Sequence, residues 1–428
     1  MAKEKILIKG GRVIDPANKI DDTLDILIAD SRISKVSKAI KAEDAKVLDA
    51  SGKIIIPGLV DMHVHLREPG REDKETIYTA TKAALHGGVT AVLAMPNTDP
   101  AIDSLSSIEI LKTAISKSAQ ANVLICAAIT TGRKGRELVD MAMLKREGVV
   151  AFSDDGSSVD SDEIMLAALR SAKKAGLPVI CHCEDKALSN FGVVNLGFTS
   201  TRLGLRGVSR ESEYKRVARD IDLAAQSGAA VHIAHVSCKE SLGIIARAKK
   251  KGLGVTCETA PHYFTFSEDA VLGYDTNFKM NPPLRSKEDV QAIREGLASG
   301  IIDVIASDHA PHTENEKEIE FERAEFGVVG LETELAAAIT VLVDTGFLDW
   351  FGLLEKMSLN PARILGVDKG SLGVGRDADM AIIEPGQKWQ VSKELLLSKS
   401  KNSSFIGKDL KGVVAYTIYK GALHQWNS

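Results

Sequence analysis

Apolar and polar residues alternate in two ways through the middle of the chain. Short, nearly continuous apolar runs recur, and the segments between them carry apolar residues at helical spacing, as in DEIMLAALRSAKKAG. Several of these segments end at a glycine, and Ser237 with Glu240 has the spacing of a capping box that starts a helix. The apolar runs are LVDMHVHL, VTAVLAMPN, NVLICAAIT, VVAFSDDG, LPVICHCED, AVHIAHVS, GVTCETAPHY and DVIASDHAPH. Apolar strands that alternate with helices predict an α/β fold with a parallel sheet, and eight such units predict a TIM (β/α)8 barrel.

The two ends of the chain have a different pattern. Residues 1–57 and the last sixty or so residues read as short strands separated by Gly, Pro, Asn and Asp. Chain termini often lie close together, so the two ends can pair. We therefore predict a small β-sandwich domain built from residues 1–57 and 368–428, and a barrel from residues 58–367.

Composition narrows the class of protein. The 428 residues are 44% hydrophobic, enough for a large core, and the net charge is −4 without a basic stripe, which argues against a nucleic-acid partner. No apolar run approaches the ~20 residues that span a bilayer, and the first residues lack a signal-peptide pattern. The five cysteines are an odd number, which favours reduced thiols and a cytoplasmic location.

Polar residues follow nearly every predicted barrel strand. The carboxyl ends of barrel strands open on one face, where the active sites of such barrels lie, so residues distant in sequence should converge there. These strand-end residues are His63, His65, Asn97, Asp154, Asp155, His182, Glu184, His235, His262, Asp308, His309 and His312.

His63 and His65 are the first candidates for metal binding. Side chains two apart on a strand point to the same side, so both imidazoles can grip one ion, although hydrogen-bonded histidines are the alternative. Two histidines and an aspartate at the ends of three other strands favour metal binding over the hydrogen-bonded alternative. Imidazole with carboxylate suits zinc, but also manganese, iron or cobalt. Two metals bridged by a carboxylate need roughly six protein ligands, and the sequence offers that number.

Several motifs resemble those of one enzyme family. DMHVHLREPG, AMPNTDP, AFSDDG, CHCED, HVS, NPPLR and SDHAPH are similar to the motifs of bacterial dihydroorotases, members of the amidohydrolase superfamily alongside hydantoinases and allantoinases. The resemblance covers the whole chain. It implies reversible cyclisation of N-carbamoyl-L-aspartate to (S)-dihydroorotate, a step of de novo pyrimidine (UMP) biosynthesis.

The resemblance also implies the ligand set. Two zinc ions are expected, one held by His63, His65 and Asp308 and the other by His182 and His235, with a bridging carboxylate between them. Many relatives use a carbamylated lysine at the end of strand four, but this strand ends AFSDDG. Asp154 and Asp155 are adjacent and so point to opposite sides, and the family motif favours Asp155 as the bridge. His232 faces away from His235 and is expected in the barrel wall.

Asp308 is the expected catalytic residue. Water activated by zinc would attack the ring amide, and Asp308 would take its proton and deliver it to the leaving nitrogen. The alternative is a purely structural metal ligand.

The substrate carries a carboxylate outside the reacting ring. Arg67 lies two residues beyond His65 and its planar fork suits a carboxylate, with a surface salt bridge as the alternative. The resemblance adds Asn97, Asn281 and His312, and places Phe326 and Gly327 near the ring. A turn-capping role remains open for Asn97, and an ordinary loop for 326–327.

Other interpretations stay open. Glu184, His309 and Asp61 are candidates to orient ligands. Residues 313–329 are highly charged and predict a solvated loop or a mobile lid. The rival functions are another cyclic-amide hydrolase, such as a hydantoinase or allantoinase, and a non-catalytic subunit. We expect a homodimer, and association with aspartate transcarbamoylase is possible.

Overall fold

The computed structural model describes residues 5–426. All eight apolar runs contain strands, and within the described residues these strands form one parallel sheet. In spatial order they are β6 (Leu59–Val64), β7 (Val89–Ala94), β8 (Asn122–Ala127), β9 (Val149–Phe152), β10 (Val179–Cys181), β13 (Val231–Ile233), β14 (Val255–Thr259) and β15 (Val304–Ile305). A parallel bridge between Val64 and His309 brings the last strand back to the first, so the predicted barrel is confirmed and nearly closed.

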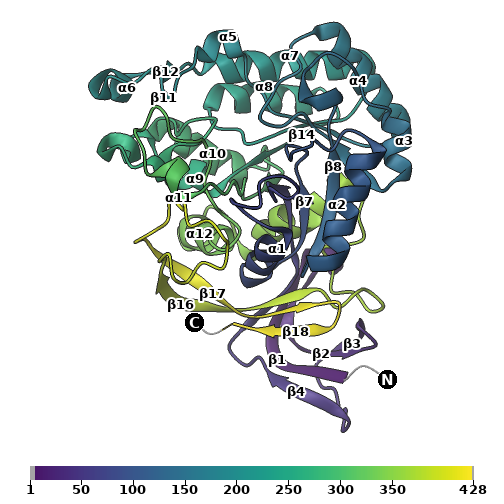
Figure 1. Cartoon of the computed structure of the whole chain (residues 1–428). Helices are drawn as coiled ribbons and strands as arrows, with labels where there is room; N and C mark the ends of the chain where they lie inside the picture. The colour runs from purple at the N-terminus through teal and green to yellow at the C-terminus, as the bar shows by residue number, and fades with distance from the viewer. Residues whose placement is uncertain (1–4, 427–428) are drawn as a thin grey trace.

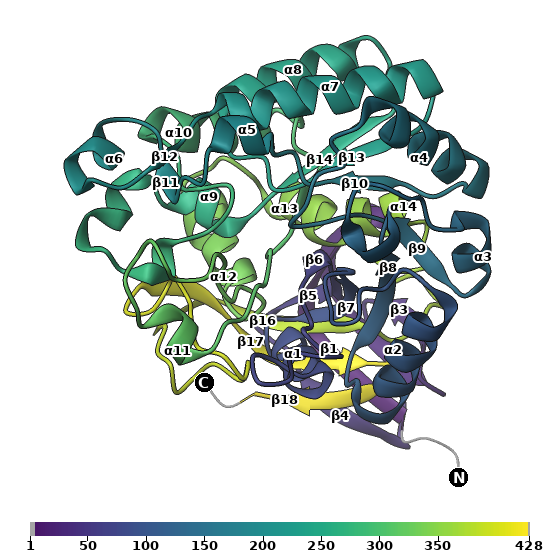
Figure 2. The same cartoon turned by 45° about the horizontal axis from the view of Figure 1, so that its top comes forward.

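Helices surround this barrel (Figure 2). Helix α4 shows why they form: Ser161 accepts a hydrogen bond from Ile164 N at its start, and Gly176 ends it with a φ of 66°. Its buried face packs against the strands. The outer helices are α1 (Ile77–His86), α2 (Leu105–Ser118), α3 (Met141–Arg146), α4 (Asp162–Ala175), α7 (Glu211–Ser227), α8 (Lys239–Lys250), α10 (Lys287–Ala298), α12 (Glu334–Ala338), α13 (Trp350–Leu354) and α14 (Asn360–Leu365), with π-helical turns at Ile339–Val343 and Glu355–Leu359.

The predicted capping box at Ser237 is wrong. Helix α8 begins one residue later, with Cys238 at its N-cap and no side-chain cap. The Ser237 hydroxyl instead donates to the buried carboxylate of Glu213. The Ser237 hydroxyl therefore pairs with a buried carboxylate that is distant in the sequence, and it does not cap the helix as the local spacing predicts.

Strands from both ends of the chain form one mixed sheet, as Figure 1 shows by the purple and yellow strands lying together. The two ends meet where β5 pairs with β16, with Ile55 opposite Ile382. The strands are β1 (Lys5–Asp15), β2 (Ile20–Ala29), β3 (Arg32–Ser37), β4 (Ala45–Asp49), β5 (Ile54–Pro57), β16 (Met380–Gln390), β17 (Asp409–Tyr419) and β18 (Ala422–Gln425). The composite β domain is confirmed, and β1 makes its sheet branch by pairing with β2, β4 and β5. The exact domain boundaries stay predictions.

The loops after the barrel strands carry short elements on the side where the polar residues gather. Beyond β10 lie α5 (Lys186–Ser189), β11 (Val194–Asn195), α6 (Phe198–Leu203) and β12 (Gly207–Val208). Beyond β14 lie α9 (Pro261–Thr265) and the 3-10 turns Glu268–Gly273 and Thr276–Phe278, and beyond β15 lies α11 (Glu314–Lys317). Further 3-10 turns are Pro16–Asn18 and Thr131–Arg133.

Two predictions drawn from composition can be compared with the structure. All five cysteines are buried free thiols. Over residues 5–426, every helix is too short or too polar to cross a bilayer.

Candidate metal centre and substrate cavity

The predicted metal ligands meet at the mouth of the barrel. Two groups of buried side chains can each hold an ion, and within each group the ligand atoms lie within 4.8 Å of one another. The first group is His63, His65 and Asp155, and the second is Asp155, His182 and His235. Asp155 thus belongs to both groups, the position that a bridging carboxylate would occupy.

Buried atoms without hydrogen bonds test whether cations fit here. His63 Nε2 and Asp155 Oδ1 are both buried and make no hydrogen bond with any described residue. They lie 3.3 Å apart. Buried polar groups are normally paired, and a divalent cation would use the lone pairs of both atoms. The donor set of imidazoles and a shared carboxylate therefore fits two metal ions.

Asp308 lies beside the two histidines of the first group. Its Oδ1 lies 3.5 Å from His63 Nε2 and 3.4 Å from His65 Nε2. Burial opposes ionisation, but His63 and His65 hold the pKa of Asp308 below its ordinary value. The structure thus places an ionised carboxylate beside the first ligand group.

Outer contacts decide which nitrogen each histidine presents to the centre. His63 Nδ1 lies 2.5 Å from Glu258, His65 Nδ1 lies 2.9 Å from Asn97 Oδ1, and His182 Nε2 lies 3.3 Å from Glu184. Each contact binds one ring nitrogen and turns the other toward the centre, where His182 Nδ1 lies 2.8 Å from His235 Nε2. Glu184 therefore contacts His182 and Asn97 contacts His65, as residues that orient metal ligands would.

Glu258 was not predicted as a functional residue. It is 1% exposed and lies between His63 Nδ1 and His232 Nε2, the latter at 3.2 Å. Burial opposes its ionisation, but the two histidines lower the pKa of Glu258 to about 2. His232, expected in the barrel wall, thus lies there as a buried partner of this carboxylate, and its Nδ1 contacts Thr256.

Three other polar residues near the strand ends accept hydrogen bonds from backbone N–H groups. Asp154 accepts from Ile129 N at 2.8 Å and Thr130 N at 3.1 Å, so it caps a loop while Asp155 points inward. Asp61 accepts from the backbone N of His63, and His309 Nδ1 accepts from Gly330 N. Neither Asp61 nor His309 contacts a ligand ring nitrogen in these bonds, so their predicted role in orienting metal ligands is not supported.

The predicted substrate residues line the same cavity as the ligands. This cavity has a volume of about 250 Å³ and is partly open to solvent. Its walls include Arg67, Asn97, Asn281, His312, Phe326 and Gly327. The structure therefore brings all the predicted substrate contacts together above the metal centre.

The guanidinium of Arg67 forms no ion pair with a carboxylate of the described residues. Its Nε donates to Pro311 O at 3.1 Å, its Nη2 lies 3.3 Å from His312 Nε2, and no carboxylate of the described chain pairs with it. Burial lowers the pKa of Arg67 to about 10, so it stays charged at neutral pH. A partly buried charge is costly unless it is paired, which favours an anionic group on the molecule that enters this cavity.

Comparison with known proteins identifies the family. A sequence model described as dihydro-orotase-like matches residues 52–241. The dihydroorotase of Elusimicrobium minutum is 51% identical over 98% of this chain and 97% of its own length. The dihydroorotase of Geotalea daltonii is 51% identical over 97% of this chain and 98% of its own length. The chain belongs to the dihydroorotase family.

Solved structures show that this dihydroorotase-family chain shares its fold with hydantoinases. The L-hydantoinase of Arthrobacter aurescens superposes with a TM-score of 0.89 at 24% identity, covering 98% of this chain and 96% of that one. The D-hydantoinase of a Thermus species gives a TM-score of 0.83 at 23% identity, covering 99% and 97%. At this identity the likeness concerns the fold alone.

Residues 313–329 form one wall of the cavity in this dihydroorotase-family chain, and we call them the rim segment. The rim segment wraps around two lysines: Lys317 Nζ donates to Glu325 O at 2.8 Å and Gly327 O at 3.0 Å, and Lys279 Nζ donates to Phe321 O at 2.8 Å. Lys317 is buried. The prediction of a solvated loop is therefore wrong in part, since a lysine in a charged stretch gives no sign in the sequence that it is buried.

Proposed function

We propose that the chain is a dihydroorotase that interconverts N-carbamoyl-L-aspartate and (S)-dihydroorotate with two zinc ions. His63, His65 and Asp308 would hold one ion and His182 and His235 the other, with Asp155 as the bridge. The observation that carries this proposal is the unpaired Arg67 in a cavity whose floor is a two-metal ligand set. The ring of dihydroorotate has an amide to open and a carboxylate to pair with that cation.

The chemistry of the proposed ions is common to zinc hydrolases. Bound zinc would lower the pKa of a coordinated water from about 16 to about 7 and polarise the carbonyl of the substrate. Proton transfer and substrate binding would be carried out by side chains of this chain.

Asp308 would move the proton. Its Oδ1 lies toward His63 and His65, which leaves Oδ2 to take a proton from the attacking water during ring opening. The same oxygen would then give that proton to the leaving ring nitrogen, and ring closure runs in reverse. His63 and His65 lower the pKa of Asp308, so the carboxylate is ionised, as a group that takes up a proton must be.

Arg67 and His312 would hold the substrate carboxylate. Burial lowers the pKa of His312 and the nearby Arg67 and Lys74 lower it further, so the ring is neutral. Its one N–H, at Nε2, lies 2.8 Å from Phe326 O and would be shared with the carboxylate. Asn97 and Asn281 line the same cavity, and their amide groups would bind the same carboxylate or the ring. Phe326 and Gly327 close the cavity over the ring.

Metal analysis alongside turnover tests the proposal. We expect two zinc ions per chain, turnover of dihydroorotate, and little turnover of hydantoin or allantoin, which lack the carboxylate that Arg67 would bind. Asp308→Asn should abolish turnover while much of the metal stays bound. Faster turnover of hydantoin or allantoin than of dihydroorotate would contradict the substrate assignment, and near-normal turnover by Asp308→Asn would contradict the role of that residue.

Assembly and location stay predictions from the sequence. We expect a homodimer in the cytoplasm, and gel filtration with and without aspartate transcarbamoylase, followed by an activity assay, tests both the dimer and a dependence on that partner.

A further inference from the structure

A stretch of the C-terminal part of the chain crosses from the mixed sheet to the mouth of the barrel. It comprises residues 391–408, between β16 and β17, and we call it the crossing segment. The crossing segment has no helix or strand, yet Asn402, Ser403, Ser404 and Phe405 are at most 6% exposed. Buried polar groups need partners, so the contacts of the crossing segment show what it holds.

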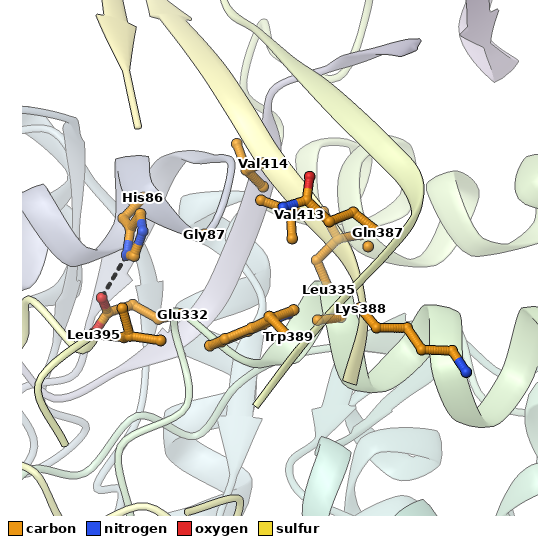
Figure 3. Close-up of a pocket in the computed structure, with 12 residues that line it drawn as sticks. His86, Gly87, Glu332, Leu335, Gln387, Lys388, Trp389, Leu395, Val413 and Val414 are labelled. Atoms are coloured by element: carbon orange, nitrogen blue, oxygen red, sulfur yellow. Dashed lines mark hydrogen bonds and ion pairs between the residues drawn. The ribbon is translucent and has the colours of Figure 1, made fainter. Parts of the chain in front are cut away.

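The first half of the crossing segment is fixed to two carboxylates of the barrel. Glu332 accepts from Leu397 N at 2.7 Å and Ser398 N at 3.1 Å, and Glu75 accepts from Lys399 N at 3.1 Å. Glu332 is fixed in turn by His86 Nδ1 at 2.7 Å, the contact drawn in Figure 3 at the edge of a cleft between barrel and sheet. The crossing segment is therefore anchored before it reaches the substrate cavity.

The Asn402 side chain then bonds three main-chain groups at the cavity, and its backbone carbonyl accepts from Val329 N at 3.0 Å. Its Oδ1 accepts from His312 N at 3.1 Å, and its Nδ2 donates to Ala310 O at 3.2 Å and Gly327 O at 3.1 Å. Ala310 and His312 lie soon after β15, whereas Gly327 lies further along the same loop, in the rim segment. One amide thus ties together two walls of the cavity that come from two parts of the long loop after β15.

The two walls already touch where Asn402 joins them. Gly327 has a φ of 122°, and a Cβ placed there would lie 2.6 Å from the Ala310 Cβ. The His312 ring strengthens the same join, because its Nε2 donates to Phe326 O at 2.8 Å while its Nδ1 accepts from Lys74 Nζ at 3.0 Å. A small loosening of this junction would move His312 relative to Phe326.

We propose that Asn402 is a positioning residue that sets the spacing between the His312 wall and the Phe326–Gly327 wall, and so sets affinity for the substrate carboxylate. This inference rests on the proposed function. Asn402 does not line the cavity itself, so it acts through the residues that do. It gives the C-terminal part of the chain a share in substrate binding.

Two substitutions remove the tie in different ways. Asn402→Ala removes all three hydrogen bonds, whereas Asn402→Asp keeps the acceptor for His312 N and turns a carboxylate toward two carbonyl oxygens. Because the loosened junction moves His312 relative to Phe326, we expect the KM for dihydroorotate to rise about tenfold or more. The kcat should change less than about threefold, because the metal ligands and Asp308 are not touched by Asn402.

A matched control lies two residues away. Ser404 is equally buried, and its Oγ donates to Asn277 O at 2.6 Å, away from the two walls. Ser404→Ala removes one hydrogen bond of the crossing segment without loosening the junction. It should lower the melting temperature slightly and leave KM unchanged.

The experiment measures KM, kcat, zinc content and melting temperature for the zinc-loaded wild type and all three variants. Binding of orotate, a planar ring with the same carboxylate, is measured by calorimetry. The inference expects both Asn402 variants to keep their zinc, to bind orotate about tenfold more weakly and to raise KM. Unchanged KM and orotate affinity in a folded Asn402 variant would overturn it, as would an equal rise in KM for Ser404→Ala.

Hydrogen exchange of the wild-type protein tests the tie even if both Asn402 variants fail to fold. The amide of His312 should exchange as slowly as the barrel strands before any ligand is added, since Asn402 Oδ1 accepts from it. Fast exchange there would overturn the inference. Wild-type protein that fails to turn over dihydroorotate would contradict the proposed function itself, whereas wild-type turnover with an unaffected Asn402 variant contradicts only the positioning role.

Discussion

Replacing Glu258 by glutamine removes the charge behind His63 and keeps nearly the same volume. Glu258 holds His63 Nδ1 on one oxygen and His232 Nε2 on the other, in a site that water does not reach. The glutamine oxygen can still accept from His63. Its amide group faces His232, which can adopt the other tautomer because the Thr256 hydroxyl is able to donate or accept.

The expected fall in zinc affinity follows from the loss of the Glu258 charge alone. A hydrogen bond to a charged group contributes about 1.5–3 kcal/mol and a neutral one about 1 kcal/mol, so the substitution costs about 0.5–2 kcal/mol of the interaction energy that orients His63. That corresponds to a fall in zinc affinity of about 2- to 30-fold at the site of His63 and His65. Glu258→Ala should cost more, since it leaves a buried ring nitrogen unsatisfied.

Competition with a chromophoric chelator measures zinc affinity without relying on turnover. Two binding steps are expected for the wild type, and only the step that belongs to the His63 site should weaken in Glu258→Gln. Thr256→Val is the control, because it removes the contact at the far end of the same chain of residues and should change affinity less than about threefold. Wild-type zinc affinity in Glu258→Gln would refute the reasoning.

Three further predictions follow from the site and the core. Arg67→Ala should raise the KM for dihydroorotate by about 10–100-fold because a charge-assisted contact is lost, and an unchanged KM would show that the cation does not bind substrate. Removal of metal by a chelator should abolish turnover, and zinc alone should restore it without bicarbonate, because the shared ligand is the plain carboxylate of Asp155; a bicarbonate requirement would contradict this. Burial raises the pKa of Glu334 well above 4.5, so the unfolded chain ionises first and the free energy of unfolding falls as pH rises above that value. Glu334→Gln should therefore raise the melting temperature more at pH 8 than at pH 5, and equal shifts would argue against a buried acid.

The barrel and its ligands could be predicted because local pattern decides them. Each barrel strand is short and buried on both faces, so its sequence is an apolar run, and the side-chain period of two places His63 and His65 on one side. The same period separates Asp154 from Asp155, and the structure shows Asp154 bound to the loop and Asp155 within the ligand groups. These features depend on neighbours within a few residues.

The missed residues depend on partners far along the chain. Glu258 lies 195 residues from His63, and within its own strand it reads as one charged residue in an otherwise ordinary run. Lys317 sits in a charged stretch, where sequence favours exposure, and is buried because carbonyl groups of the folded rim segment surround it. Asn402 follows a run of polar residues typical of a surface loop. A single sequence gives no sign of any of these pairings.

The pairing of β5 with β16 sets an order of events during synthesis. Pro57 lies opposite Met380, so β5 leaves the ribosome more than three hundred residues before its neighbour exists. Until then the apolar edge at Ile54–Ile56 is open, and open strand edges invite pairing with other chains. The crossing segment is made later still. The nascent protein can therefore assemble its metal ligands early, but the sheet and the Asn402 tie are completed together, in the last stage of translation.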